Sequence, residues 1–127
     1  MSWVIGGFRD DDAQRWVEQF TDEGLSAISA ALTSLIEADQ EELDESQCHV
    51  ALAAVEVVAA LLGEPSDDLP EEVQEWVEEN EDPVDDAIRK KSASALERLE
   101  ESKGLVPTED WGRFQSYLSH LKQRLEA

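Results

Sequence analysis

The chain has little cysteine, proline or glycine: one, four and six residues among 127. The single Cys48 excludes an intrachain disulfide, which is typical of a reducing cytoplasm. The glycines occur as Gly6-Gly7 and as isolated residues, so there is no phosphate-binding loop. The longest apolar stretch, Val50 to Leu62, is interrupted by Glu56 and is too short to cross a bilayer. Residues 1–8 lack a basic start followed by a long apolar run, so we expect no signal peptide and a cytoplasmic protein.

Basic residues are scarce in the first two thirds of the chain. Residues 1–88 contain 25 Asp and Glu against only Arg9 and Arg15, a net charge of −23. Residues 89–127 carry +2, so the whole chain carries −21. A surface this acidic repels nucleic-acid phosphate and anionic lipid, and it attracts cationic surfaces. We therefore expect a basic protein partner and no binding to nucleic acid or membrane.

The hydrophobic residues are sufficient for a folded core. They make up 41% of the chain, against 32% charged residues, and they include four Trp and three Phe. A chain of 127 residues is long enough to bury such a core without disulfides or a structural metal. No internal repeat or interdomain linker divides the sequence. Residues 1–127 are therefore expected to form one domain.

The spacing of the apolar residues predicts an all-α fold. Periods of 3.6 residues recur, whereas no alternating strand pattern persists. Asp22 is expected to cap the second helix, and the third helix is apolar nearly all round, which predicts a central position. A short non-helical segment, residues 1–9, is expected to pack onto this central helix. The sequence thus predicts a compact domain of about six helices, at approximately 10–20, 22–36, 46–62, 70–80, 84–101 and 108–125.

No constellation of residues indicates an enzyme, a metal site or a cofactor. Asp10-Asp11-Asp12 lacks the alternating oxygen ligands and closing Glu of a calcium loop, and helix capping explains it better. Cys48 and His49 are adjacent and His120 is distant in sequence, which does not match a zinc site or a catalytic pair. We expect no catalytic residues, no bound metal, no cofactor and no enzymatic activity.

Glu56 is the exception within the apolar third helix. Valine and alanine surround it from 53 to 60, and an ionised carboxylate there is costly unless it is hydrogen-bonded or paired. One interpretation is a structural anchor, in which the carboxylate accepts hydrogen bonds from the backbone amides of Gly6-Gly7 or forms an ion pair with Arg9 or Arg15. The alternative is a functional group, either a ligand or an acid that burial keeps protonated.

Two acidic runs are candidates for binding. One lies at residues 39–45, and the other surrounds Trp76 with Asp67, Asp68, Glu71, Glu72, Glu75, Glu78 and Glu79. Like charges at three- and four-residue spacings destabilise an isolated helix. The second run is either a solvated face that maintains solubility or a docking surface for a basic partner, where charge raises the association rate.

The opening of the chain resembles a known family. Trp3, Gly6-Gly7-Phe8 and residues 11–16 are similar to the Trp-Gly-x-Gly-x-Phe-x-Asn-Asp-Asp-Ala start of the bacterial family called domain of unknown function 4259. The resemblance continues through residues 53–60, Gly63, Leu69-Pro70, Trp76 and residues 121–125, although Val4-Ile5 departs from it. It implies a small acidic helical protein and no activity. It also makes one structural unit of the N-terminal segment and the central helix, comprising Trp3, Phe8, Asp12, Trp16 and Glu56.

Taken together, these patterns favour a non-enzymatic binding protein. Our hypothesis is an inhibitor or immunity-type partner of a basic bacterial protein such as a toxin or nuclease, with Trp76 or Trp111 as an exposed aromatic anchor. The alternative is a stand-alone or self-associating housekeeping protein whose acidity serves only solubility. In either case we expect a monomer or weak homodimer, with the basic C-terminal segment folded against the acidic body.

Overall fold

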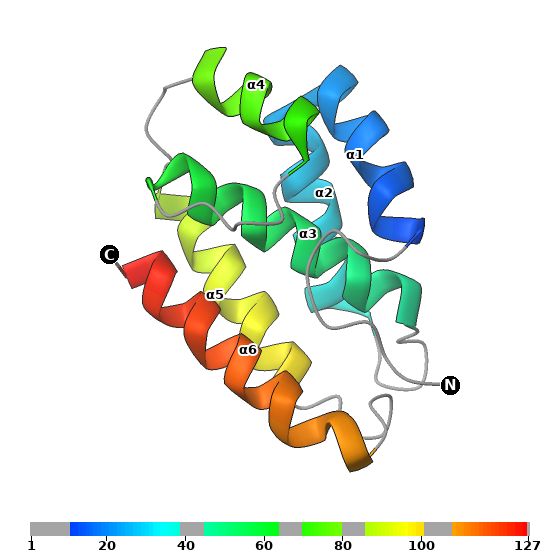
Figure 1. The fold of residues 1–127 in the computed structure, drawn as a ribbon, viewed down its shortest axis with the longest axis vertical. Helices are drawn as coiled ribbons and strands as arrows, with labels where there is room; N and C mark the ends of the chain where they lie inside the picture. The colour runs from blue at the N-terminus through cyan, green and yellow to red at the C-terminus, as the bar shows by residue number, and fades with distance from the viewer. Residues whose placement is uncertain (1–10, 39–44, 64–69, 80–85, 101–107, 127) are drawn as a thin grey trace.

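The computed structural model describes residues 11–38, 45–63, 70–79, 86–100 and 108–126, and these form six helices (Figure 1). No strand occurs within these ranges. The prediction of a compact all-α domain of six helices is confirmed. The expected non-helical segment 1–9 lies outside the described residues. The helices are α1 (Asp11–Glu23), α2 (Leu25–Glu37), α3 (Glu45–Leu61), α4 (Glu71–Glu79), α5 (Asp86–Glu100) and α6 (Thr108–Glu126).

Helix α3 is the central helix of the domain. It contacts α1, α2, α4, α5 and α6, and its residues 51–60 are all buried. A helix that is covered on most sides must be apolar on most sides, which explains its nearly continuous run of Ala, Val and Leu. The core around it is completed by large buried side chains from the other helices, including Phe20, Ile28, Leu96, Phe114 and Leu121.

The turn between α1 and α2 differs from the prediction. Helix α1 continues through Asp22 to Glu23, and Gly24 precedes α2 without a side-chain cap. The predicted cap at Asp22 is therefore wrong. Gly24 has φ +64°, a conformation that glycine adopts without the steric cost of a Cβ atom. The chain reverses at the residue that tolerates this backbone geometry and not at the nearest polar residue.

Helix α4 packs on α1 and α3 through one apolar face. Val73 is buried, and the Trp76 ring lies with its centroid 4.7 Å from that of Phe20 on α1. A Cβ atom on Gly24 would stand 3.2 Å from Cζ2 of Trp76, so the absence of a side chain there permits the close approach. Pro70 precedes the helix, and its carbonyl accepts hydrogen bonds from the amides of Val73 and Gln74.

Helices α5 and α6 pack against each other and against the rest of the domain. Helix α5 contacts α2 and α3, and α6 contacts α3 (Figure 1). The buried side chains that make this layer include Ile88, Leu96 and Leu99 from α5 and Leu118 and Leu125 from α6. The basic C-terminal segment therefore folds against the acidic body, as expected.

Candidate functional site

Glu56 is a charged side chain in the most apolar part of the protein. It lies in the middle of α3 with 1% of its surface exposed, and its sequence neighbours Val55 and Val57 are fully buried. A carboxylate removed from water in this way requires partners that replace its hydration. The structure supplies those partners from α6.

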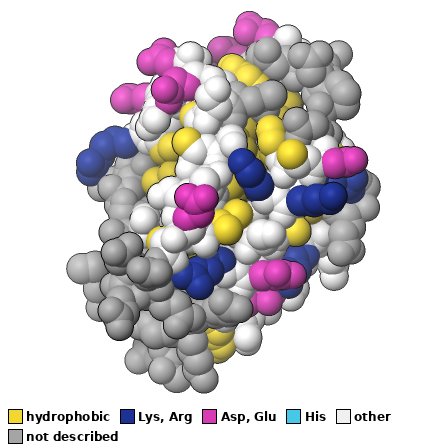
Figure 2. Space-filling view, turned by 180° about the vertical axis from the view of Figure 1, so that it is seen from behind, with side chains coloured by type: hydrophobic (Ala, Val, Ile, Leu, Met, Phe, Trp, Pro, Cys, Tyr) yellow, Lys and Arg dark blue, Asp and Glu magenta, His cyan; other side chains and the backbone are white. Residues whose placement is uncertain are grey.

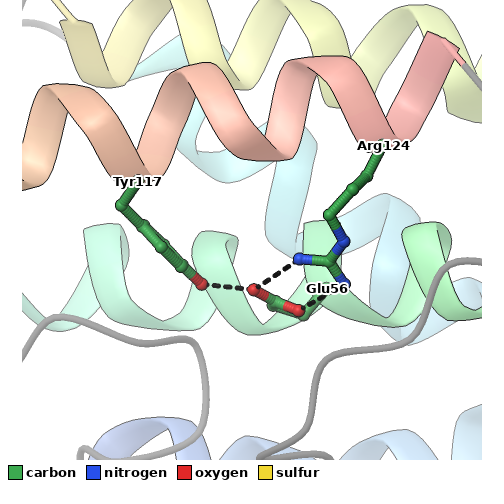
Figure 3. A network of polar contacts seen from close by, with 3 residues as sticks. All are labelled: Glu56, Tyr117 and Arg124. Carbon is green, nitrogen blue, oxygen red and sulfur yellow. Dashed lines mark hydrogen bonds and ion pairs between the residues drawn. The ribbon is translucent and has the colours of Figure 1, made fainter.

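Two side chains of α6 bind both oxygens of the Glu56 carboxylate (Figure 3). The Tyr117 hydroxyl donates to Oε1 at 2.5 Å. Arg124 donates through Nη2 to Oε2 at 3.0 Å and through Nη1 to Oε1 at 3.3 Å. Tyr117 and Arg124 are seven residues apart, which places them on one face of the helix two turns apart. The guanidinium thus forms a two-point ion pair with a carboxylate that also accepts the tyrosine hydroxyl.

This network differs from the partners proposed for Glu56 from the sequence. Gly6, Gly7 and Arg9 lie outside the described residues, and Arg15 is exposed on α1. The Glu56 side chain is 2% exposed and that of Arg124 is 10% exposed, so the pair is shielded from solvent. Its charges neutralise each other and its geometry ties α3 to α6. This arrangement favours the structural interpretation of Glu56 over the functional one.

The other predicted anchor residues can be placed only in part. Trp16 is buried on α1 and its ring stacks on Phe20 with a centroid separation of 5.4 Å. Trp3 and Phe8 lie outside the described residues, and the side chain of Asp12 is not described. Their union with Glu56 in one structural unit stays a prediction.

The predicted acidic binding residues on α4 are all on the surface. Glu71, Glu72, Glu75, Glu78 and Glu79 are exposed, and α4 contains no basic residue. Helix α1, against which α4 packs, adds exposed Glu18, Asp22 and Glu23. We call these eight carboxylates the α1–α4 acidic face. Figure 2 shows acidic side chains along the upper edge of the molecule, where α1 and α4 lie, and most basic side chains below them. Asp67 and Asp68 lie outside the described residues.

The two candidate aromatic anchors are partly buried and are engaged within the protein. Trp76 packs on Phe20, and the ring of Trp111 lies 5.9 Å from that of Phe114. Each ring therefore offers a partner only the part that these contacts leave uncovered. Both residues are partly buried because the same apolar faces attach their helices to the core, and their role as the aromatic anchor stays a prediction.

Several basic residues of α5 and α6 bind groups within the chain. Arg89 donates through Nε and Nη2 to the carbonyl of Leu125 at 2.9 and 2.6 Å, near the end of α6. Arg98 donates to the carbonyl of Ala38, which ends α2. Cations at these positions satisfy carbonyls without helical partners and interact favourably with the helix dipole. Further contacts join Lys91 to Ser29 and Lys122 to Glu100.

Within the described ranges, no three His, Cys, Asp or Glu side chains are grouped in a way that could hold a metal ion. Cys48 and His49 are buried side by side in sequence on α3, whereas His120 is exposed on α6. None of the helices in the described part of the chain combines the length and the apolar character that crossing a bilayer requires.

Comparison with known proteins identifies the family of this chain. No curated protein and no solved structure matches it. Residues 2–120 match a family model described as Domain of unknown function (DUF4259). This match spans both the helices that carry the acidic face and the residues of α3 and α6 up to His120, including Glu56 and Tyr117. The resemblance noted in the sequence is confirmed, and the chain belongs to the DUF4259 family.

Proposed function

We propose that this protein is a non-enzymatic binding module that docks a basic protein through the α1–α4 acidic face, as an inhibitor or immunity-type partner of a basic bacterial toxin or nuclease. The observation that carries this proposal is the clustering of eight exposed carboxylates on two packed helices, of which α4 has no base. The family description supplies no activity, so the proposal depends on this surface.

The acidic face has an energetic cost in the isolated protein. Glu75 has like charges three and four residues away in both directions, at Glu71, Glu72, Glu78 and Glu79. Each such pair destabilises a helix by about 0.2–0.5 kcal/mol. Helix α4 is short, and its buried attachment rests on Val73 with the partly buried Trp76 and Val77. A cationic partner would relieve the repulsion and thereby gain affinity.

The positions of the bases support the same proposal. The described bases lie on α5 and α6, apart from Arg15 on α1. Arg89, Arg98 and Arg124 bind carbonyls or a buried carboxylate, as described above. They stabilise the fold while leaving α4 with no base of its own. Acidity needed only for solubility would not require this separation.

The proposed role of the face is mainly to accelerate and select the encounter. Charge complementarity raises association rates by about 10- to 1,000-fold and makes them fall with ionic strength. It also disfavours acidic or neutral competitors for the same surface. We therefore expect fast, salt-dependent association with a partner whose contacting surface is rich in Lys and Arg.

The first test is to capture partners on the tagged protein from a lysate of its own host, with washes at low and then moderate salt and identification by mass spectrometry. We expect one dominant basic protein that salt releases. No stoichiometric partner at either salt concentration, with the bait verified as folded by circular dichroism, would contradict the proposal. It would favour the alternative of a stand-alone or self-associating protein with solubilising acidity.

The second test measures association rates of the captured partner with two matched variants. Glu75→Gln with Glu78→Gln removes two charges from the acidic face, whereas Asp86→Asn with Glu97→Gln removes two exposed charges from α5. We expect the first pair to slow association by about threefold and to flatten its salt dependence. The second pair should change both by much less. Equal effects of the two pairs would show that only total charge matters, and would remove α4 from the binding surface.

A further inference from the structure

A groove whose described lining residues carry no charge lies beside α1, one of the two helices of the acidic face. It has a volume of about 300 Å³ and lies between α1, α2 and the first half of α3. This volume is at the lower end of the range for ligand pockets, about 300–1,000 Å³, and suits a side chain better than a large cofactor. The residues that shape it include Trp16 and Gln19 from α1, Ala30, Ala31 and Ser34 from α2, and Val50 from α3.

None of the described residues that line the groove is charged. Trp16 is 5% exposed and forms part of the hydrophobic core, while Ala31 and Val50 are partly buried beside it. Ala30 and Ser34 are exposed and have small side chains, so the side of the groove formed by α2 is shallow. Seen from behind, hydrophobic side chains reach the surface among charged ones (Figure 2).

Acidic residues stand at both ends of the groove. The Gln19 amide donates to Glu23 Oε2 at 2.8 Å, which fixes one carboxylate next to a lining residue. Glu37 follows Ser34 by three residues on α2 and is exposed, so it lies about one turn beyond the groove. One base, Arg15, precedes Gln19 by one turn. An apolar centre with a polar, mostly acidic rim is the arrangement of a protein-binding surface whose partner is basic.

We propose that this groove receives apolar side chains from an amphipathic helix of the basic partner, while Lys and Arg on the flanks of that helix contact the carboxylates of α1 and α2. This inference rests on the proposed function, and it assigns the apolar anchor that neither Trp76 nor Trp111 provides in full. The groove is lined in part by α1, which also carries Glu18, Asp22 and Glu23, so a helix seated in it would lie along the helix that carries three carboxylates of the acidic face. Apolar side chains seated in such grooves supply most of the affinity in helix-in-groove recognition.

The test uses two synthetic peptides of identical Lys and Leu composition. In one peptide all Leu lie on a single helical face, and in the other the order is shuffled so that no such face exists. Titration calorimetry at a fixed ionic strength gives the affinity of each peptide. We expect the amphipathic peptide to bind at least about tenfold more tightly, a difference of about 1.4 kcal/mol. Nuclear magnetic resonance shifts on titration should be largest at Trp16, Gln19, Ser34 and Val50.

A groove-filling variant and a control variant test whether the preference for the amphipathic peptide comes from the groove. Ala30→Trp fills the groove, and Ala87→Trp adds the same side chain at an exposed helical alanine of α5. Circular dichroism verifies that both variants fold. We expect Ala30→Trp to reduce the affinity of the amphipathic peptide to that of the shuffled one, and Ala87→Trp to leave it unchanged. Equal affinities of the two peptides for the wild-type protein, or equal effects of the two variants, would overturn the proposal.

The failure of this inference is distinguishable from failure of the proposed function. The substitutions Glu75→Gln and Glu78→Gln should weaken both peptides by the same factor, because they act on charge alone. If they change the affinity of neither peptide, the acidic face is not a binding surface, even where the preference for the amphipathic peptide persists. A dimer of the protein that Ala30→Trp dissociates, detected by sedimentation, would assign the groove to a second copy and would also overturn the proposal.

Discussion

Replacing Arg124 with Met removes the cation from the buried Glu56 carboxylate while keeping a long side chain at that position. In the wild-type protein the guanidinium binds both carboxylate oxygens, at 3.0 and 3.3 Å. In the variant, the Tyr117 hydroxyl remains as a described partner from α6. Glu56 must then either stay ionised without a countercharge in an apolar setting or take up a proton. Both outcomes destabilise the native state.

The size of the effect follows from the burial of the pair. Removing one partner of a buried ion pair costs about 3–5 kcal/mol, because the other charge is left uncompensated. The Arg124 side chain retains 10% exposure, against 2% for Glu56, so some water can approach the vacated position. We therefore expect Arg124→Met to lower the free energy of unfolding by about 3 kcal/mol, the lower end of that range. Tyr117→Phe removes one hydrogen bond to a charged acceptor and should cost about 2 kcal/mol.

The assay is urea unfolding at fixed pH and ionic strength, followed by circular dichroism. Arg113→Met is the matched control, because Arg113 is an exposed arginine on the same helix and its loss changes the net charge equally. The double variant Glu56→Leu with Arg124→Met removes both charges, and we expect it to lie within about 1 kcal/mol of the wild type. If Arg124→Met differed from Arg113→Met by less than about 0.5 kcal/mol, the typical effect of a surface substitution, the network would not be an anchor.

Two further predictions concern α1 and α4. Gly24→Ala should lower the free energy of unfolding by about 2 kcal/mol, since it places a Cβ at φ +64° and 3.2 Å from the Trp76 ring, and urea unfolding would measure it. A loss below about 0.5 kcal/mol would show that the turn relaxes. Conversely, Glu75→Gln with Glu78→Gln should stabilise the protein by about 1 kcal/mol at low salt, because it removes four like-charge pairs within α4, and by less at high salt. Thermal unfolding at two salt concentrations tests this, and a gain that does not depend on salt would contradict the electrostatic cause.

The helices were predictable because their signal is local. Apolar residues recur along the helices with a period of about 3.6 residues. The nearly continuous apolarity of α3 already indicates that neighbouring helices surround it. The prediction of a cap at Asp22 was wrong because a capping residue contributes only about 1 kcal/mol to helix stability, and this local preference competes with the tertiary arrangement. Glycine is required at this turn because of its φ of +64°, and the close contact with Trp76, which is far away in sequence, adds to that requirement.

The partners of Glu56 could not be predicted, because the pairing is long-range. Arg124 lies 68 residues from Glu56, and any of several arginines could reach a central carboxylate. A weaker signal is present in α6. Tyr117 and Arg124 flank Leu121 at spacings of four and three residues, so they share the apolar face of the helix that enters the core. Polar side chains on such a face indicate a buried polar partner, and Glu56 is the only charged side chain among the described residues that is buried.

Trp76 shows how one residue can support two interpretations. Its spacing from Val73 predicts an inward position, whereas its five glutamate neighbours suggest a surface aromatic that contacts a partner. The structure shows the packing contact, while contact with a partner stays a prediction. A helix as short as α4 has few apolar residues with which to attach itself to the core, so its tryptophan is required for that attachment. The contact with Phe20 reflects this requirement.

The same reasoning connects the stability of the protein to its proposed role. The chain has ten bases against 31 acids, and the described arginines Arg89, Arg98 and Arg124 bind groups whose burial or helix-end position makes an unpaired state costly. Bases placed in α4 would have relieved its internal repulsion directly. With none in that helix, the repulsion remains available to a cationic partner as binding free energy. The groove beside α1 would then add the apolar contacts that charge alone does not provide, because exposed ion pairs contribute only about 0–1 kcal/mol each.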